Sequence, residues 1–271
     1  MPSFVTKFAL SALGTALAKE YLANTVGVYS EVAATYARYI NRENIAEREL
    51  MRVFRSGDFG KEISDIVVEG SKKNDTIISQ VFREGGNAGY TAMRVDSLFG
   101  ASFREGFKYL QEYNSFLLSE TTSDLGGAIM GRVASGFAAD EHPFSIARDI
   151  LSSGVDLPAK AGFTSRQRAF MIARTETARA WTQGAAQSYA NMGVTLYNHV
   201  TAGDDDVCGD CISLEEGNPH SLQDIFIPVH PNCRCAMAPV VPDNLEFNDN
   251  GEVINLTPVE MDFPDFDSEW E

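Results

Sequence analysis

The chain has 271 residues, of which 44% are hydrophobic and 22% charged, and this balance excludes a wholly disordered, collagen-like or disulfide-dense protein. Much of the net charge of −16 comes from residues 241–271, which contain ten acidic residues and no lysine or arginine. Residues 1–240 are close to neutral and have no excess of lysine and arginine, which argues against tight direct binding to DNA. No uninterrupted apolar stretch reaches the roughly 18 residues of a membrane-spanning helix, so we expect no contact with a membrane.

The first 21 residues allow two interpretations. Lys7 precedes a short apolar run and the small-residue segment 16–18, a weak likeness to a secretory signal. The same segment has apolar residues at helical spacing, namely Leu10, Leu13, Leu17 and Tyr21. We favour an amphipathic helix because the cysteine cluster farther along suits a reducing compartment, and we therefore expect residue 1 to belong to the mature protein.

Residues 1–155 are predicted to be mostly helical. Apolar periodicity indicates helices over 28–55, 62–83, 91–118 and 143–152, with glycines breaking the pattern near 57–60 and 85–89. The glycines between 120 and 140 weaken a helix there, or else let one pack closely through small residues. We find no phosphate-binding loop and no nucleophile elbow, and residues 154–162 read as a linker.

The signals become stronger after residue 162. Thr164 and Gln167 have the spacing of a capping box, which predicts a helix from 165 that ends at Gly193. Alternation over 194–200 predicts a strand, and Pro239 places a second short strand at a sheet edge. The predicted fold class is α+β, mainly α.

We expect three segments in chain order. A helical region would occupy residues 1–155, and a small zinc-stabilised α+β domain would occupy 156–240. Residues 241–271 would form an acidic flexible tail whose charge and prolines oppose independent folding. The tail is either simply solvated or docks on a partner through its aromatic residues, which are Phe247, Phe263, Phe266 and Trp270.

All four cysteines fall in a short stretch that has the spacing of a metal site. The pattern is C-x2-C followed after 18 residues by H-x2-C-x-C, and the candidate ligands are Cys208, Cys211, His230, Cys233 and Cys235. Zinc (Zn²⁺) takes about four ligands in a tetrahedron, so one of these five is redundant in a site with one ion per chain. Cys208 and Cys211 are the best candidates, and we favour His230 and Cys233 to complete the set, with Cys235 as the rival.

Two other interpretations of the cysteines remain open: short-range disulfides, or buried thiols without a metal. If a metal binds, we expect a structural zinc and no catalytic residue. A deaminase H-x-E and a metalloprotease HExxH motif are both absent from the sequence. The remaining histidines are isolated and are expected to be ordinary surface or packing residues, namely His142, His199 and His220.

The order of these features resembles the phage head morphogenesis family, typified by the minor head protein F of phage Mu. The resemblance covers residues 163–240 and depends on I-A-R-T-E-T in the helix and H-P-N-C-R-C after the C-x2-C pair. It implies a minor capsid protein that is not an enzyme. Such a protein lies in the virion near the portal, after assembly in the host cytoplasm. It contacts portal and other head proteins, touches DNA at most indirectly, and assists head assembly and genome packaging or ejection.

Two alternatives come from other functional classes. One is a virion-carried enzyme or effector that uses the zinc or an Arg174–Glu176 pair. Residues at i and i+2 of a helix do not face each other, so we favour pairing of Glu176 with Arg179 instead. The other alternative is a cellular zinc-ribbon adaptor, which would not associate with a portal complex.

Overall fold

The structure is a computed structural model that describes residues 12–41, 46–93, 104–157, 163–224, 227–243, 246, 248–249, 254 and 257–261. The chain forms two compact units, each assembled from separate stretches of sequence. Unit 1 contains residues 1–19, 76–112 and 174–271, and unit 2 contains 20–75 and 113–173. The three segments expected from the sequence follow chain order, so their boundaries at 155/156 and 240/241 remain a proposal.

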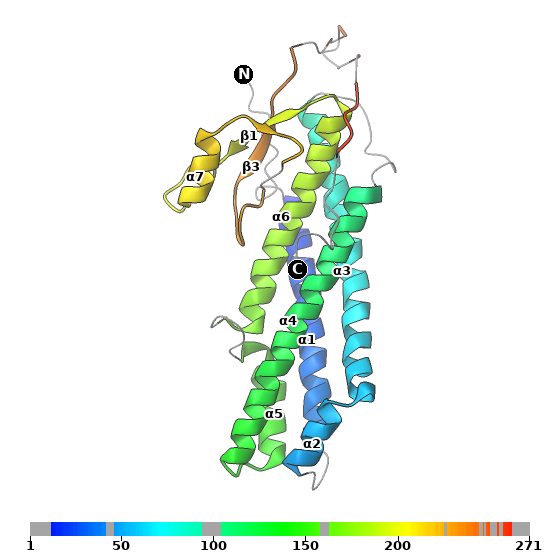
Figure 1. Cartoon of the computed structure of the whole chain (residues 1–271), viewed down its shortest axis with the longest axis vertical. Helices are drawn as coiled ribbons and strands as arrows, with labels where there is room; N and C mark the ends of the chain where they lie inside the picture. Colours follow the sequence, from blue (N-terminus) through cyan, green and yellow to red (C-terminus); the bar gives the residue numbers. More distant parts are fainter. Residues whose placement is uncertain are drawn as a thin grey trace. The chain divides into compact units, whose positions relative to one another are not determined.

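Helices dominate the described residues, with one small sheet (Figure 1). The helices are α1 (Ala12–Ile40), α2 (Glu47–Phe54), α3 (Gly57–Ala92), α4 (Arg104–Ala138), α5 (Pro143–Ser153), η2 (Gly154–Asp156), α6 (Ser165–Asn191) and α7 (Gly209–Glu216). The strands are β1 (Leu196–Val200), β2 (His220–Ser221) and β3 (Ala236–Pro239). The predicted α+β, mainly α class is confirmed. None of the described helices combines the length and apolarity that crossing a membrane requires.

The core of unit 2 forms where the apolar stripe of α1 meets α2, α3, α4 and α5. Val28, Val32 and Tyr36 of the predicted stripe are buried, and the Tyr36 ring lies 4.8 Å from the rings of both Phe54 and Phe59. Such tilted and edge-to-face pairs add to the free energy gained by burying the rings. The single helix predicted over 28–55 is instead two helices, α1 and α2.

A buried polar layer also joins the helices of unit 2. The Asn24 side-chain amide donates to Asn74 Oδ1 at 2.7 Å, and Asn74 in turn donates to Thr25 Oγ1 at 3.2 Å. On another side, the Tyr29 hydroxyl donates to Thr121 Oγ1 at 2.6 Å. Buried polar groups paired in this way favour one relative placement of the helices, because a shift would leave them unsatisfied.

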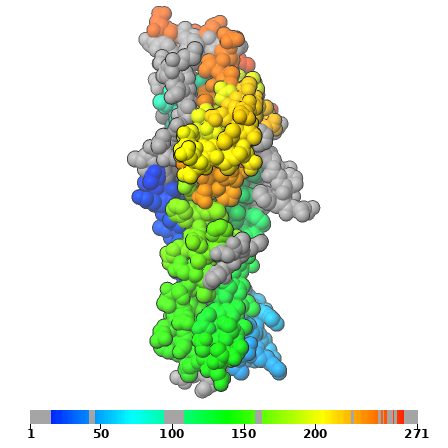
Figure 2. Space-filling model, turned by 90° about the vertical axis from the view of Figure 1, so that its left-hand side faces the viewer, coloured from blue at the N-terminus to red at the C-terminus, as the bar shows by residue number. Residues whose placement is uncertain are grey.

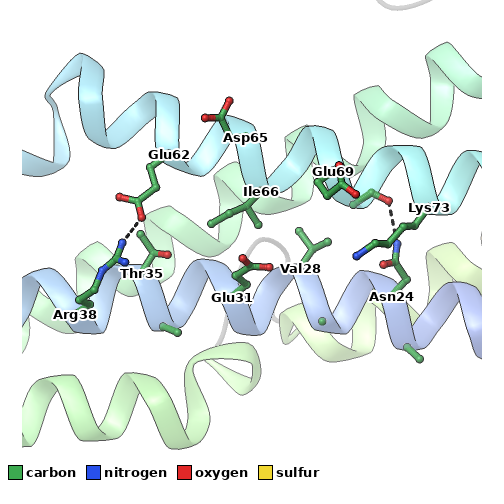
Figure 3. A pocket seen from close by; sticks show the side chains of 14 residues that line it. Asn24, Val28, Glu31, Thr35, Arg38, Glu62, Asp65, Ile66, Glu69 and Lys73 are labelled. Carbon is green, nitrogen blue, oxygen red and sulfur yellow. Dashed lines mark hydrogen bonds and ion pairs between the residues drawn. The ribbon is translucent and has the colours of Figure 1, made fainter.

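A groove lies between α1 and α3 in unit 2 (Figure 3). Its cavity measures about 760 Å³ and has Val28 and Ile66 among its lining residues. Charged side chains from both helices surround this apolar part, among them Glu31 and Lys73 (Figure 3). Arg38 and Glu62 form an ion pair across the groove. The groove is therefore a surface feature with a charged rim.

The glycine-rich stretch at 85–89 and the one that begins at 120 lie inside helices, whereas the predicted break near 57–60 is present between α2 and α3. Helix α3 continues past Gly85 and Gly89, and α4 runs unbroken from 120 to its end at Ala138. In α4 the glycines allow close packing within unit 2: a Cβ at Gly136 would lie 2.6 Å from Ile146 Cδ1. The expectation of a break at 85–89 was wrong, because close packing against another helix outweighs the low helix propensity of glycine.

Unit 1 depends on a main-chain contact between α3 and α6. A Cβ at Gly85 would lie 2.1 Å from the Trp181 carbonyl oxygen, and one at Gly184 would lie 2.0 Å from the Phe82 carbonyl oxygen. Ser188 Oγ donates to the Gly86 carbonyl at 2.7 Å across the same contact. Only glycine lets the two backbones approach this closely, so these positions fix α6 against α3.

The end of α6 leads directly into the sheet. The predicted capping box is present at its start, with the Thr164 N–H donating to Gln167 Oε1 at 2.9 Å and the Gln167 N–H donating to Thr164 Oγ1 at 3.2 Å. At the other end, Gly193 adopts a positive φ of 78°, as predicted for a helix terminus. The strands that follow pair antiparallel in the order β2-β1-β3, so β3 is an edge strand as Pro239 predicted.

Part of the acidic tail packs on unit 1. The Val259 N–H donates to the Ala190 carbonyl at 2.9 Å, and Met261 is 7% exposed within the core formed by the end of α6 and the sheet. The expectation that residues 241–271 stay off the core is therefore wrong for residues 257–261. The free energy gained by burying the apolar Met261 side chain outweighs the preference of its acidic neighbours for solvent. The four tail aromatics lie outside the described residues.

We expect Gly184→Ala to destabilise the protein by about 3 kcal/mol or more, because the new methyl group would overlap main-chain atoms that cannot move independently. The control is Gly127→Ala in α4, where a Cβ would meet no atom of the described residues within 4 Å. That change should stabilise by about 0.5–1 kcal/mol through helix propensity. Urea unfolding followed by circular dichroism compares them, and equal effects would contradict the packing role of Gly184.

We expect Met261→Ala to cost about 2 kcal/mol or more, since it removes a buried side chain and leaves a cavity. Ile254→Ala is the matched control, because Ile254 is 59% exposed and its loss should cost less than about 0.5 kcal/mol. Thermal and urea unfolding of both variants measure the difference. If Met261→Ala has the stability of the unchanged chain, the tail does not belong to the core.

Candidate metal centre

The first half of the site is the N-terminus of α7, a helix that the sequence did not predict. Cys208 is the N-cap, with its Sγ accepting from the Cys211 N–H at 3.5 Å. One helical turn therefore brings Cys208 and the buried Cys211 together, which is what the C-x2-C spacing required. Helix α7 packs beside β1 within unit 1 (Figure 1) and lies at the surface in the yellow region of Figure 2.

The second half of the site is the loop before β3. Asn232 has a φ of 63°, a left-handed conformation that asparagine tolerates, and its N–H donates to Thr175 Oγ1 of α6 at 3.0 Å. This bond joins the R-T-E segment of α6 to the H-P-N-C loop. The following Arg234 pairs with Asp204 at 2.6 Å, which holds the loop to the turn that precedes Cys208.

Three of the five predicted ligands, Cys208, Cys211 and His230, approach one another at distances suited to zinc, and a fourth, Cys233, approaches Cys211. His230 Nε2 lies 3.2 Å from Cys208 Sγ and 3.4 Å from Cys211 Sγ, and Cys211 Sγ lies 4.0 Å from Cys233 Sγ. Tetrahedral zinc with its usual bond lengths places two sulfurs about 3.8 Å apart and a sulfur and a nitrogen about 3.5 Å apart. These side chains could therefore hold a metal ion, and the favoured assignment of Cys208, Cys211, His230 and Cys233 stays a prediction.

The imidazole of His230 is oriented for this role. Its Nδ1 lies 2.9 Å from the Pro231 carbonyl oxygen, and a proton shared there leaves Nε2 free to face the two thiols. Metal-bound histidines commonly use their second nitrogen in this way. The carbonyl also raises the pKa of His230.

The fifth predicted ligand, Cys235, belongs to a second group. Its Sγ, the Sγ of Cys211 and a ring nitrogen of His199 all lie within 4.8 Å of one another. From the sequence, His199 is expected to be an ordinary surface or packing residue. The signal that could have identified it is the period of β1, which buries Tyr197 and His199 on one face while Leu196 faces solvent.

The thiols differ in acidity because they share protons. Hydrogen bonding from Cys235 lowers the pKa of Cys233 to about 4, whereas burial raises the pKa of Cys211 to about 12. The pKa of Cys235 is also raised, mainly through its bond to Cys233. Cys233 is thus the favoured thiolate in the metal-free chain, and binding of zinc by the other thiols must release protons.

The Arg174–Glu176 pair of the enzyme alternative is not formed. Glu176 instead pairs with Arg179, with Arg179 Nε 3.1 Å from Glu176 Oε2, which confirms the predicted i,i+3 interaction. Burial raises the pKa of Glu176, and the charge of Arg179 opposes that shift. The described residues include no hydrogen bond or ion pair to the Arg174 guanidinium. The ion pair between Glu176 and Arg179 therefore stabilises α6.

Comparison with known proteins identifies one family. The model of the family described as Phage Mu protein F like protein matches residues 132–238. The match begins in α4, earlier than the 163–240 expected from the motifs, and includes all four cysteines, His199 and His230. No curated protein and no solved structure matches the chain.

We expect Thr175→Val to loosen the second half of the site, because valine keeps the shape of threonine but cannot accept the Asn232 N–H. The loss should be about 1 kcal/mol of stability, together with faster release of bound zinc to a chelator. Thr175→Ser is the matched control, since it keeps the hydroxyl group and should restore the slow release. If both variants release zinc at the same rate, the hydrogen bond does not position the loop.

Proposed function

Because residues 132–238 belong to the Phage Mu protein F like family, whose members act in phage head morphogenesis, we propose that this chain is a minor capsid protein of a tailed phage. In this proposal it lies inside the head near the portal and assists head assembly and genome packaging or ejection. The family match is the observation that carries the proposal. The near-neutral body of the chain supports contacts with proteins rather than with the phosphate backbone of DNA.

We assign a structural zinc to the cysteine cluster. The residues fit this group because thiolates and imidazoles are the ligands that zinc prefers, and the spacing of Cys208, Cys211 and His230 suits three corners of a tetrahedron. The ion would tie the N-terminus of α7 to the loop before β3, two short segments that bury little apolar surface themselves. A locally complete set of protein ligands leaves no position for a substrate, which supports a scaffold rather than an enzyme.

Unit 1 would then be held together in three ways. The glycine contact fixes α6, the Thr175–Asn232 bond connects α6 to the metal loop, and zinc connects that loop to α7. A small domain stabilised in this way keeps a defined surface although its sheet has only short strands. We propose that this surface and the helices of unit 2 contact portal and neighbouring head proteins.

We expect Cys208→Ser to reduce both zinc content and incorporation into heads. With free zinc at about 100 times the dissociation constant, loss of binding costs about 2.7 kcal/mol of stability. Asp210→Asn is the matched control, because it changes an exposed residue in the same helical turn and should leave both properties intact. Heads purified from infected cells and tested for this chain, portal and major capsid protein provide the measurement.

Two outcomes would contradict the proposal. If the unchanged chain is absent from purified heads and does not co-purify with portal or other head proteins, the assignment as a capsid protein is wrong. If Cys208→Ser heads contain the normal amount of the chain although zinc is lost, the metal has no part in assembly.

A further inference from the structure

Among the described residues of unit 1, His199 is a fully buried histidine whose ring nitrogens make no hydrogen bond. The side chain is 0% exposed, and neither ring nitrogen has a hydrogen-bond partner among the described residues. Leaving a buried polar group without a partner costs free energy, and native proteins normally avoid it. A ligand bound to a ring nitrogen would supply the missing partner and is the simplest way to stabilise this arrangement.

The backbone at His199 is held firmly. Its N–H donates to Asn218 Oδ1 at 2.6 Å, and Asn218 Nδ2 donates back to the His199 carbonyl at 2.8 Å. His199 pairs with Met237 of β3, so the side chains of both residues lie on the same face of the sheet. Cys235 lies two residues before Met237 and therefore shares that face. The imidazole is therefore directed at the cysteine cluster by both the strand pairing and the Asn218 side chain.

The donor atoms form two groups that share one sulfur. Cys208, Cys211 and His230 make the first group, and His199, Cys211 and Cys235 make the second, with the atoms of each group within 4.8 Å of one another. Cys233 adds a further sulfur 4.0 Å from that of Cys211. Six donors in all exceed the four that one zinc ion takes.

The charge of the cluster points the same way. Four thiolates carry four negative charges, and a single Zn²⁺ would leave two of them uncompensated next to buried residues, or leave two thiols protonated and unused. Two divalent ions neutralise four thiolates, and buried charge is tolerated only when it is compensated. Sharing Cys211 gives each ion three protein ligands, and Cys233, whose sulfur lies close to that of Cys211, is available as a fourth ligand for one of them.

We propose that the centre binds two zinc ions that share the Cys211 thiolate, with His199 and Cys235 as ligands of the second ion. This inference rests on the proposed zinc site and adds a second metal position to it. Each cysteine gives up its proton on binding and the sulfur becomes a metal ligand, so no oxidant or reductant takes part. The redundancy of Cys235 in a one-ion site disappears, because it belongs to the other ion.

The test is the number of zinc ions bound to the full-length chain, purified under reducing conditions and measured by native mass spectrometry with elemental analysis. We expect two zinc ions for the unchanged chain and one for His199→Gln and for Cys235→Ser. The control is His142→Gln, which alters an exposed histidine of unit 2 and should still bind two. Far-ultraviolet circular dichroism of each variant checks that it is folded.

Cobalt provides a second readout that needs no variant. Two Co²⁺ ions bridged by a thiolate couple magnetically, so the unchanged chain loaded with two equivalents of Co²⁺ should give a weaker electron paramagnetic resonance signal per ion than the same chain loaded with one equivalent. A single zinc in the unchanged chain, or two zinc ions that persist in His199→Gln, would overturn the inference. A chain that binds no zinc at all would instead overturn the proposed zinc site on which it rests.

Discussion

The close contact between the backbones of α3 and α6 is the constraint on which the rest of unit 1 depends. Glycine at 85 and 184 lets carbonyl groups approach where any side chain would clash. With α6 fixed in this way, its C-terminal end leads into β1, and Thr175 on its side meets the loop that carries His230 and Cys233. The packing of one helix pair thus determines where the cysteine cluster can form, before any metal binds.

Helix packing stabilises one part of unit 1, and the proposed metal would stabilise another. The apolar core at the end of α6 also includes Met261 from the tail, so chain from beyond the matched segment contributes to it. The cysteine cluster buries few large apolar side chains, and its cohesion would come from coordination instead. This division suits a small domain whose sheet is too short to be stable by itself. It also explains why the ligands come from segments at both ends of the sheet region.

Local sequence signals predicted much of this structure. The capping box at Thr164, the end of α6 at Gly193 and the edge position of β3 follow from residue chemistry within a few positions. The sequence-based predictions were wrong where contact with a segment distant in the chain determines the local structure. Helix α3 passes Gly89 because α6 packs there, and His199 joins the cysteines because β1 pairs with β3. Spacing along the chain revealed five candidate ligands, but no spacing rule connects a residue to a cluster across a sheet.

We propose above all that the cysteine cluster is a zinc centre. The most direct measurement is a crystal structure of the full chain with anomalous diffraction recorded on both sides of the zinc absorption edge. Our account predicts anomalous density at about 2.3 Å from the Sγ atoms of Cys208 and Cys211 and at about 2.1 Å from His230 Nε2. Thiols with no anomalous density between them, or a disulfide among the four cysteines, would contradict it.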